Sequence, residues 1–459
     1  MALQDFGLQK LSLTLRERMN AADARAREEA YCPVIIEVIG RSAPRLSARI
    51  EANKGRICRE MELIPAIAAE LPLKALAELS RMVGVMRIWE DAKVYAMLDR
   101  VTPNLGASQA HEGGYTGKGV VIAVLDSGVF PHLDLTTPEN RILAWHDLLD
   151  NRPDPYDDNG HGTHIAGVIA GNGLSSQGRY CGIAPEARLV AVKVLNQDGV
   201  GRLSDLIAGL EWCLIHQATL NIKVINLSLG TTAQADYPLD PLCRAAAMAV
   251  QRGVTVCASC GKASLENQSR ATAAHPGGAY YPNGVISPSM SPRIIAVGNY
   301  DGQKTFSGAE IVTYQNSGPA SPVPKPDLVA PGMDITAIGA DGDYRTLSGS
   351  SAAASLVTGA IALILQKWPS LQPERIKGLL KKNARNLGVG VNLQGAGLLS
   401  LGEIFGLIRK KAAKSEAPRG PYDEIFKILW GMMGQNTATA NPSGELFKNI
   451  ILSLMKGFK

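Results

Sequence analysis

Three segments of the sequence place a residue used in acyl transfer beside a glycine or at the start of a predicted helix. Asp126 closes the apolar run VIAVLD, His161 lies in NGHGTHIAG, and Ser351 lies in GSSAAA. A serine hydroxyl attacks a carbonyl when an imidazole takes its proton and a carboxylate orients that imidazole. Read singly, such an aspartate caps a turn and such a serine caps a helix. Read together, the three residues predict a nucleophilic site.

The elements that must position these residues are predicted by the apolar pattern. Continuous apolar runs, typical of parallel strands buried on both faces, occur at 120–125, 189–194, 224–227 and 254–258. Helix-like segments such as 203–214 and 241–252 alternate with them. This alternation predicts a doubly wound α/β sheet whose site gathers at the carboxyl ends of the strands. His164, one turn after His161, is predicted to pack structurally rather than to bind a metal.

The three motifs, in this order, resemble the subtilase family of serine peptidases from about residue 106 to 401. Supporting stretches are GIAP at 182–185, VINLSLG at 224–230 and KPDLVAPG at 325–332. The resemblance implies a subtilisin-like three-layer α/β fold with a mostly parallel sheet. It also implies a serine endopeptidase that hydrolyses polypeptide substrates through an acyl-enzyme, with Asp126, His161 and Ser351 as the catalytic triad.

The resemblance further implies two backbone edges that hold an extended peptide by main-chain hydrogen bonds. The residues expected to form them are Gly199, Val200, Gly201, Ser228, Leu229 and Gly230. One departure touches the mechanism, because Lys262 stands where the family has the asparagine that donates into the oxyanion hole. Lys262 is expected to substitute poorly, unless Asn267 supplies the donor instead. A turnover-impaired binding or regulatory protein with a subtilase fold is therefore the alternative.

The chain is predicted to have three parts. Residues 1–98 show a strand–helix–strand–strand–helix–strand pattern, the order of a small α+β ferredoxin-like domain. By resemblance this domain is an inhibitor-type propeptide and a partner of the catalytic domain at 99–406, and self-cleavage is expected between about 95 and 106. The segment VYAML at 94–98 is suited to a substrate groove. Residues 407–459 are predicted to be a linker and amphipathic C-terminal helices.

Composition restricts the partners, the compartment and the metal sites that this chain is expected to have. The formal charge of +5 on 459 residues, without a run of basic residues, argues against nucleic acid as a partner. No secretory signal or transmembrane segment is recognised, which by resemblance indicates the intracellular branch of the family and a cytoplasmic enzyme. Seven cysteines suit free thiols, and a redox or zinc site at Cys257 and Cys260 is a distant alternative. Calcium is common in the family, but the segment 171–180 is short and has no carboxylate, so no metal or cofactor is assigned.

Overall fold

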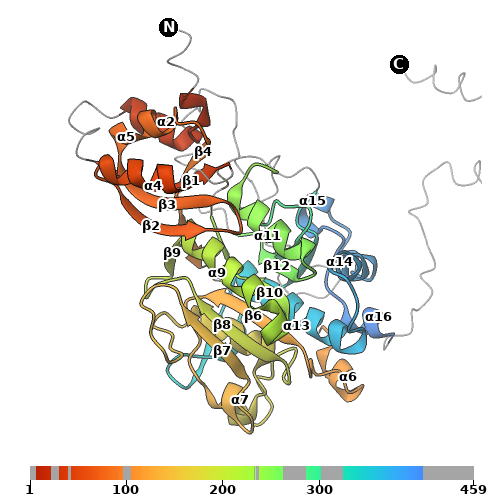
Figure 1. Ribbon diagram of the computed structural model, residues 1–459. Helices are drawn as coiled ribbons and strands as arrows, with labels where there is room; N and C mark the ends of the chain where they lie inside the picture. Colours follow the sequence, from red (N-terminus) through yellow and green to blue (C-terminus); the bar gives the residue numbers. More distant parts are fainter. Residues whose placement is uncertain are drawn as a thin grey trace, which may run out of the picture. The chain divides into compact units, whose positions relative to one another are not determined.

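The computed structural model describes residues 7–21, 30–39, 43–96, 105–231, 233, 237–261, 286–300 and 324–406 (Figure 1). The chain divides into two units, 1–408 and 409–459. The C-terminal helices predicted within 407–459 lie outside the described residues.

The N-terminal domain is a four-stranded antiparallel sheet with the strand order β2-β3-β1-β4. Its elements in chain order are η1 (Leu8–Lys10), α2 (Leu13–Ala21), β1 (Tyr31–Val38), α4 (Ala43–Ala52), β2 (Arg56–Met61), β3 (Ala66–Pro72), α5 (Leu73–Leu79) and β4 (Val85–Glu90). The ferredoxin-like order predicted for this region is therefore confirmed. A turn at 62–65 separates β2 from β3.

Successive residues of β1 face opposite sides of this sheet, as the strand period of two requires. Val34 and Ile36 pack in a core shared with α4 and α5. Ile35, which lies between them, belongs to a different core, shared with the central part of the chain. The domain therefore buries both faces of its sheet, one against its own helices and one against the second domain.

The second domain is built on a parallel sheet with the order β14-β13-β12-β10-β6-β8-β7. Its strands are β6 (Val121–Asp126), β7 (Ile142–Asp147), β8 (Arg188–Lys193), β10 (Ile222–Leu227), β12 (Thr255–Ser259), β13 (Ile295–Tyr300) and β14 (Leu328–Pro331). Four of these confirm the strands predicted from apolar runs. Because each of the four is buried on both faces, its sequence shows no polar alternation.

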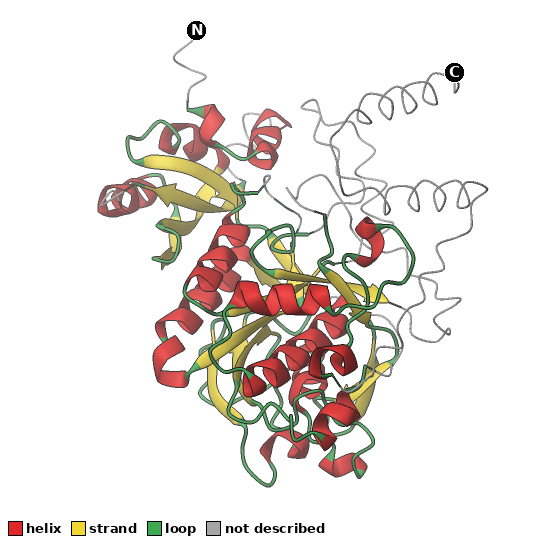
Figure 2. Cartoon of the chain, turned by 90° about the vertical axis from the view of Figure 1, so that its right-hand side faces the viewer, coloured by secondary structure: helices red, strands yellow, loops and turns green. Residues whose placement is uncertain are grey.

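Helices cover both faces of this sheet, which completes the predicted three layers (Figure 2). On one face lie α8 (His161–Ala170) and α13 (Ser350–Lys367), and on the other lie α9 (Leu203–Ile215) and α11 (Pro241–Gln251). Among the described residues, only α13 is long and apolar enough to cross a membrane, and 89% of that window is buried in the protein. This burial makes α13 a core helix of the second domain.

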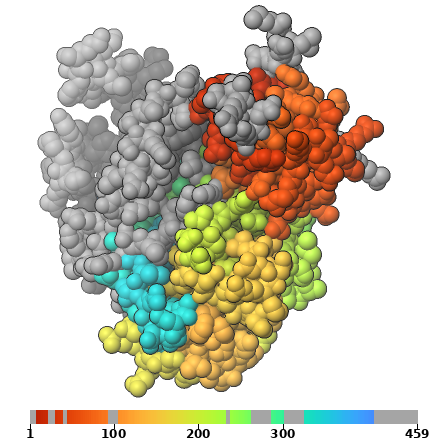
Figure 3. Space-filling view, turned by 90° about the vertical axis from the view of Figure 1, so that its left-hand side faces the viewer, coloured from red at the N-terminus to blue at the C-terminus, as the bar shows by residue number. Residues whose placement is uncertain are grey.

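Polar contacts join the N-terminal domain to α9 and α11, beside the apolar contacts already described. The guanidinium of Arg59 lies 2.9 Å from the carboxylate of Asp205, and Arg244 lies 2.6 Å from Glu37. Glu211 accepts hydrogen bonds from two backbone N–H groups of the turn after β2, at 2.8 and 3.1 Å. In Figure 3 the first domain, in red and orange, accordingly lies beside the yellow-green surface near residue 200.

Candidate active site

Asp126 and His161 come from two elements that meet at the carboxyl edge of the sheet. Asp126 is the last residue of β6 and His161 is the first residue of α8. Asp126 Oδ1 lies 2.7 Å from His161 Nδ1, and the two residues are 1% and 2% exposed. A β-carbon on Gly162 would lie 2.1 Å from the Gly128 carbonyl oxygen. Glycine at 162 therefore lets the helix start approach the turn that follows Asp126.

The turn before His161 is held by a carboxylate that the sequence analysis did not single out. Asp157 accepts hydrogen bonds from Gly160 N at 2.8 Å, Thr163 N at 2.8 Å and Ser127 Oγ at 2.9 Å. These contacts bind the start of α8 to the residue after Asp126. An aspartate a few residues ahead of a helix start is a recognised turn signal, but it does not reveal the contact with Ser127.

Ser351 is the second residue of α13 and is 1% exposed. Its Oγ donates a hydrogen bond of 2.8 Å to the carbonyl oxygen of Ser228. The Ser228 hydroxyl in turn donates to the Ser351 carbonyl at 2.9 Å. A serine hydroxyl has one proton to donate, so this proton must leave the Ser228 carbonyl before an imidazole can accept it. The structure thus places Ser351 against the first residue of a predicted substrate edge.

The two predicted substrate edges lie on either side of a segment of the protein's own N-terminal region. The strand β5 (Lys93–Ala96) pairs antiparallel with β9 (Val200–Arg202) and with β11 (Leu229–Gly230). Tyr95 is opposite Val200 on one edge and opposite Gly230 on the other. Both edges are thus bonded to an extended backbone, in the manner expected for a substrate peptide.

Close packing explains glycine at two positions of these edges. A β-carbon on Gly201 would lie 2.1 Å from the Val194 carbonyl oxygen, and one on Gly230 would lie 2.6 Å from the Ser287 carbonyl oxygen. Gly199 has φ +69°, a backbone conformation that glycine adopts without strain.

Lys262 and Asn267 lie outside the described residues, which stop at Gly261 and resume at Ile286. The donor of the oxyanion hole therefore stays a prediction. The neighbouring Cys257 and Cys260 are described, and burial raises the pKa of each thiol to about 12. Because thiol redox chemistry needs the thiolate, this burial disfavours a redox role for the two cysteines at neutral pH.

Two buried side chains, those of His164 and Asp134, bear on the expectations about metal binding. His164 Nε2 lies 2.8 Å from the Ile335 carbonyl oxygen, and burial lowers the pKa of this imidazole to about 4, which supports a structural role.

Beside the segment 171–180, the buried carboxylate of Asp134 already accepts hydrogen bonds from Ser175 N and Tyr344 Oη. No group of three potential metal ligands occurs among the described residues. The segment 171–180 itself contributes no carboxylate.

Comparisons with known proteins agree with this geometry. Residues 117–398 match the family described as "Subtilase family". The serine protease AprX of Bacillus subtilis (strain 168) is 35% identical over 354 residues, which are 72% of this chain and 76% of that protein. Subtilisin E of the same organism is 31% identical over 343 residues, covering 74% of this chain and 80% of that protein.

A solved structure shows the same fold at lower sequence identity. Fervidolysin from Fervidobacterium pennivorans, described as a keratinolytic enzyme related to subtilisin, superimposes with a TM-score of 0.63 at 20% identity. The match covers 82% of this chain and 61% of that chain. The functional conclusion rests on the family match over residues 117–398 and on the sequence identity to two proteases over 76% and 80% of their lengths. This chain belongs to the subtilase family and is a subtilisin-like serine endopeptidase.

Proposed function

We propose that Asp126, His161 and Ser351 form the catalytic triad of this endopeptidase. The Asp126–His161 contact at 2.7 Å supports a tautomer in which Nδ1–H donates to the carboxylate and Nε2 accepts a proton. Ser351 Oγ attacks the scissile carbonyl carbon while its proton moves to His161 Nε2. The imidazolium then protonates the leaving amine as the peptide bond breaks, and water hydrolyses the acyl-enzyme by the same route.

In the same proposal, the N-terminal domain is an inhibitory propeptide that fills the enzyme's own substrate groove. The observation that carries this is the pairing of β5 with both β9 and β11. The register ends with Ala96 opposite Leu229, one residue from Ser228, whose carbonyl receives the Ser351 hydroxyl. The first peptide bonds after Ala96 are therefore expected to be the ones that the enzyme cuts in itself.

The proposal also places the enzyme in the cytoplasm, as in the intracellular branch of the family. All seven cysteines are free. Free thiols at this number suit a reducing compartment, where disulfides rarely persist.

The experiment compares wild type, Ser351→Ala and Ser350→Ala as full-length proteins. Wild type is expected to react with a fluorophosphonate at Ser351 and to shorten to a species that begins soon after Ala96. Ser351→Ala should do neither. Ser350→Ala is the matched control on the same helix, and it should behave as wild type does. Intact mass and the new N-terminal residue are the measurements.

Two results would separate the parts of the proposal. Absence of fluorophosphonate labelling in wild type would contradict the triad assignment. If wild type hydrolyses peptides but stays full length, the N-terminal domain is a permanent part of the enzyme and not a propeptide.

A further inference from the structure

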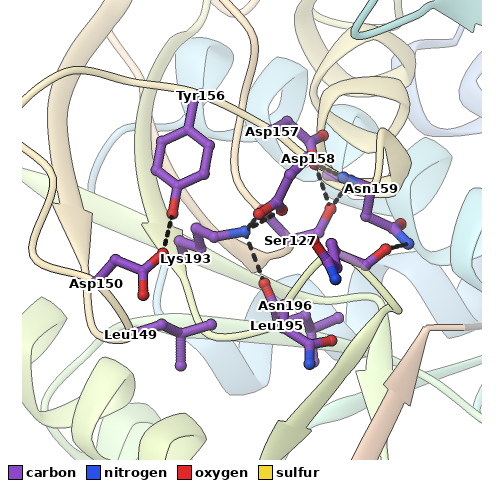
Figure 4. Close-up of polar contacts among 12 residues, drawn as sticks. Ser127, Leu149, Asp150, Tyr156, Asp157, Asp158, Asn159, Lys193, Leu195 and Asn196 are labelled. Carbon is purple, nitrogen blue, oxygen red and sulfur yellow. Dashed lines mark hydrogen bonds and ion pairs between the residues drawn. The ribbon is translucent and has the colours of Figure 1, made fainter.

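Beside the candidate triad lies a buried ammonium group that the mechanism does not use. Lys193 is the last residue of β8 and is 1% exposed. Its backbone pairs with Asp126 on the neighbouring strand. Figure 4 shows its side chain directed into a group of loops, over the ring of Tyr156, with Nζ 4.8 Å from the ring centre.

The ammonium group makes three short contacts, one to each of three loops. Nζ donates to the Ser127 carbonyl at 2.6 Å, to Asp158 Oδ1 at 2.6 Å and to the Leu195 carbonyl at 2.9 Å. A lysine ammonium has three donors, so these acceptors satisfy all of them. The group has no proton left with which to bind a substrate, which points to positioning rather than catalysis.

Each acceptor belongs to a segment that the reaction needs. Ser127 follows Asp126, the candidate triad acid, and Asp158 lies three residues before His161 in the turn that leads into α8. Leu195 is the second residue of the loop from β8 to the substrate edge β9. The ammonium therefore joins the acid, the base and the substrate edge at one point.

The contact at Leu195 reaches the substrate edge directly. The Leu195 side chain and the Val194 carbonyl oxygen both pack against Gly201. A β-carbon on Gly201 would lie 3.0 Å from the Leu195 side chain and 2.1 Å from the Val194 carbonyl oxygen. A second link between the loops is the hydrogen bond of 3.0 Å from Asn159 Nδ2 to the Gln197 carbonyl. A shift at Leu195 would therefore move β9 relative to His161.

We propose that Lys193 is a positioning residue that fixes the distance between the His161 side of the site and the peptide-binding edge β9. The proposal rests on the triad and the substrate edges proposed above. It predicts an effect that depends on substrate length, because a peptide that pairs with β9 uses this alignment and a single-residue ester does not.

The test compares Lys193→Met with Arg141→Met, each produced from the full-length chain and assayed after processing. Methionine keeps the length of the lysine stem and removes the charge and its three hydrogen bonds. Arg141 is the matched control because it is also a buried cation that donates to backbone carbonyls, those of Asp134, Ala170 and Ala187. It precedes β7 and thus lies at the amino ends of the strands, away from the site.

Active sites are titrated with a fluorophosphonate, and kcat/KM per titrated site is measured on a tetrapeptide anilide and on a single-residue ester. Lys193→Met is expected to lose about 10²-fold in kcat/KM on the tetrapeptide, the size known for a misplacement of about 1 Å, and much less on the ester. Arg141→Met should lower the unfolding temperature or the number of titratable sites and leave both constants per site within about twofold, as expected when catalytic geometry is kept.

If Lys193→Met does not fold, the double variant with Asp158→Asn replaces it, because this removes the carboxylate left without its cation. Unchanged constants per site, or equal losses on both substrates, would overturn the proposal. A wild-type enzyme that cannot be titrated would instead contradict the triad assignment, so the two failures are distinguishable.

Discussion

Two carboxylates position the imidazole of His161, one by a direct hydrogen bond and one through the backbone. Asp126 binds Nδ1 directly, whereas Asp157 acts through the backbone of the turn and the start of α8. Asp157 also accepts from the Ser127 hydroxyl, and this hydroxyl accepts from Gly162 N at 2.9 Å. The backbone around His161 is thus connected to the residue after Asp126 by a short chain of hydrogen bonds that does not include the imidazole ring. The orientation of the imidazole is a property of this whole turn.

At Lys262 we predict a slow peptidase that a single substitution improves. Loss of one oxyanion-hole donor costs about 10²–10³ in kcat, a figure taken from subtilisin itself. Lysine has a long stem that loses rotamers when it is fixed, and its charge opposes the imidazolium that forms on His161. Lys262→Asn should therefore raise kcat on a peptide substrate with KM little changed.

The control for this prediction is Asn267→Ala, measured under the same conditions. If Lys262→Asn has no effect while Asn267→Ala abolishes turnover, Asn267 supplies the donor and the alignment of this segment with the family is wrong. Steady-state kinetics per titrated active site distinguishes the two accounts.

The sequence points to the candidate catalytic residues more directly than to the residues that position them. Asp126, His161 and Ser351 each stand in a short motif, so their types and spacing could be interpreted locally. The motifs also brought Asp126 and His161 to the same sheet edge, where the structure places them 2.7 Å apart. Lys193 is the one charged residue within the apolar run at 189–194, and nothing in that run indicates a partner for it. Its role depends on Ser127, Asp158 and Leu195, which only the folded chain brings together.

At the scale of elements, the proposed substrate edge β9 is a three-residue strand that is held in place by contacts with neighbouring residues. The turn before it is closed by Asn196, whose side chain accepts from Val200 N at 3.0 Å and whose backbone N donates to the Val200 carbonyl at 2.9 Å. Behind it, Gly201 lies against Val194 with no room for a side chain. The strand β9 is therefore fixed at its start by Asn196 and along its length by the packing of Gly201 against Val194.

Gly201→Ala should consequently disturb peptide binding more than chemistry. The new methyl group would lie 2.1 Å from the Val194 carbonyl oxygen, so β9 must move away. We expect KM for a tetrapeptide to rise about tenfold, the size of one or two lost hydrogen bonds, with little change for a single-residue ester. Gly378→Ala is the control, because it lies in the helix α14 (Pro373–Lys382) with open space around it. Equal effects of the two substitutions would contradict this account.

Strands and helices of the second domain were predictable where burial was uniform. The runs that became β6, β8, β10 and β12 are apolar because helices cover both of their faces. The strand β7 was not predicted, since it lies at the edge of the sheet and its middle residues are partly exposed. The strand β14 is only four residues long and lies within the proline-containing motif at 325–332, so its sequence carries little periodicity.

At the scale of the molecule, the N-terminal domain completes a helix of the catalytic domain. Ser204 is the second residue of α9, and the carboxylate of Asp91 accepts from its backbone N at 2.8 Å and from its hydroxyl at 2.6 Å. The residue at the N-cap position, Arg202, makes no capping bond with its side chain. The cap of α9 is thus supplied by the other domain, and the proposed release of that domain would remove it.

Asp91→Ala should therefore weaken the hold of the N-terminal domain and speed the gain of activity. Removing Asp91 leaves the buried N–H and hydroxyl of Ser204 without this acceptor, and loss of such a cap costs about 1 kcal/mol, or about fivefold in an equilibrium. We expect full-length Asp91→Ala to reach full peptidase activity about fivefold sooner than wild type, on the same grounds. The control is Glu78→Ala, since Glu78 pairs with Arg49 inside the same domain. If Asp91→Ala and wild type gain activity at the same rate, the cap does not limit release, and the apolar face around Ile35 holds the domain instead.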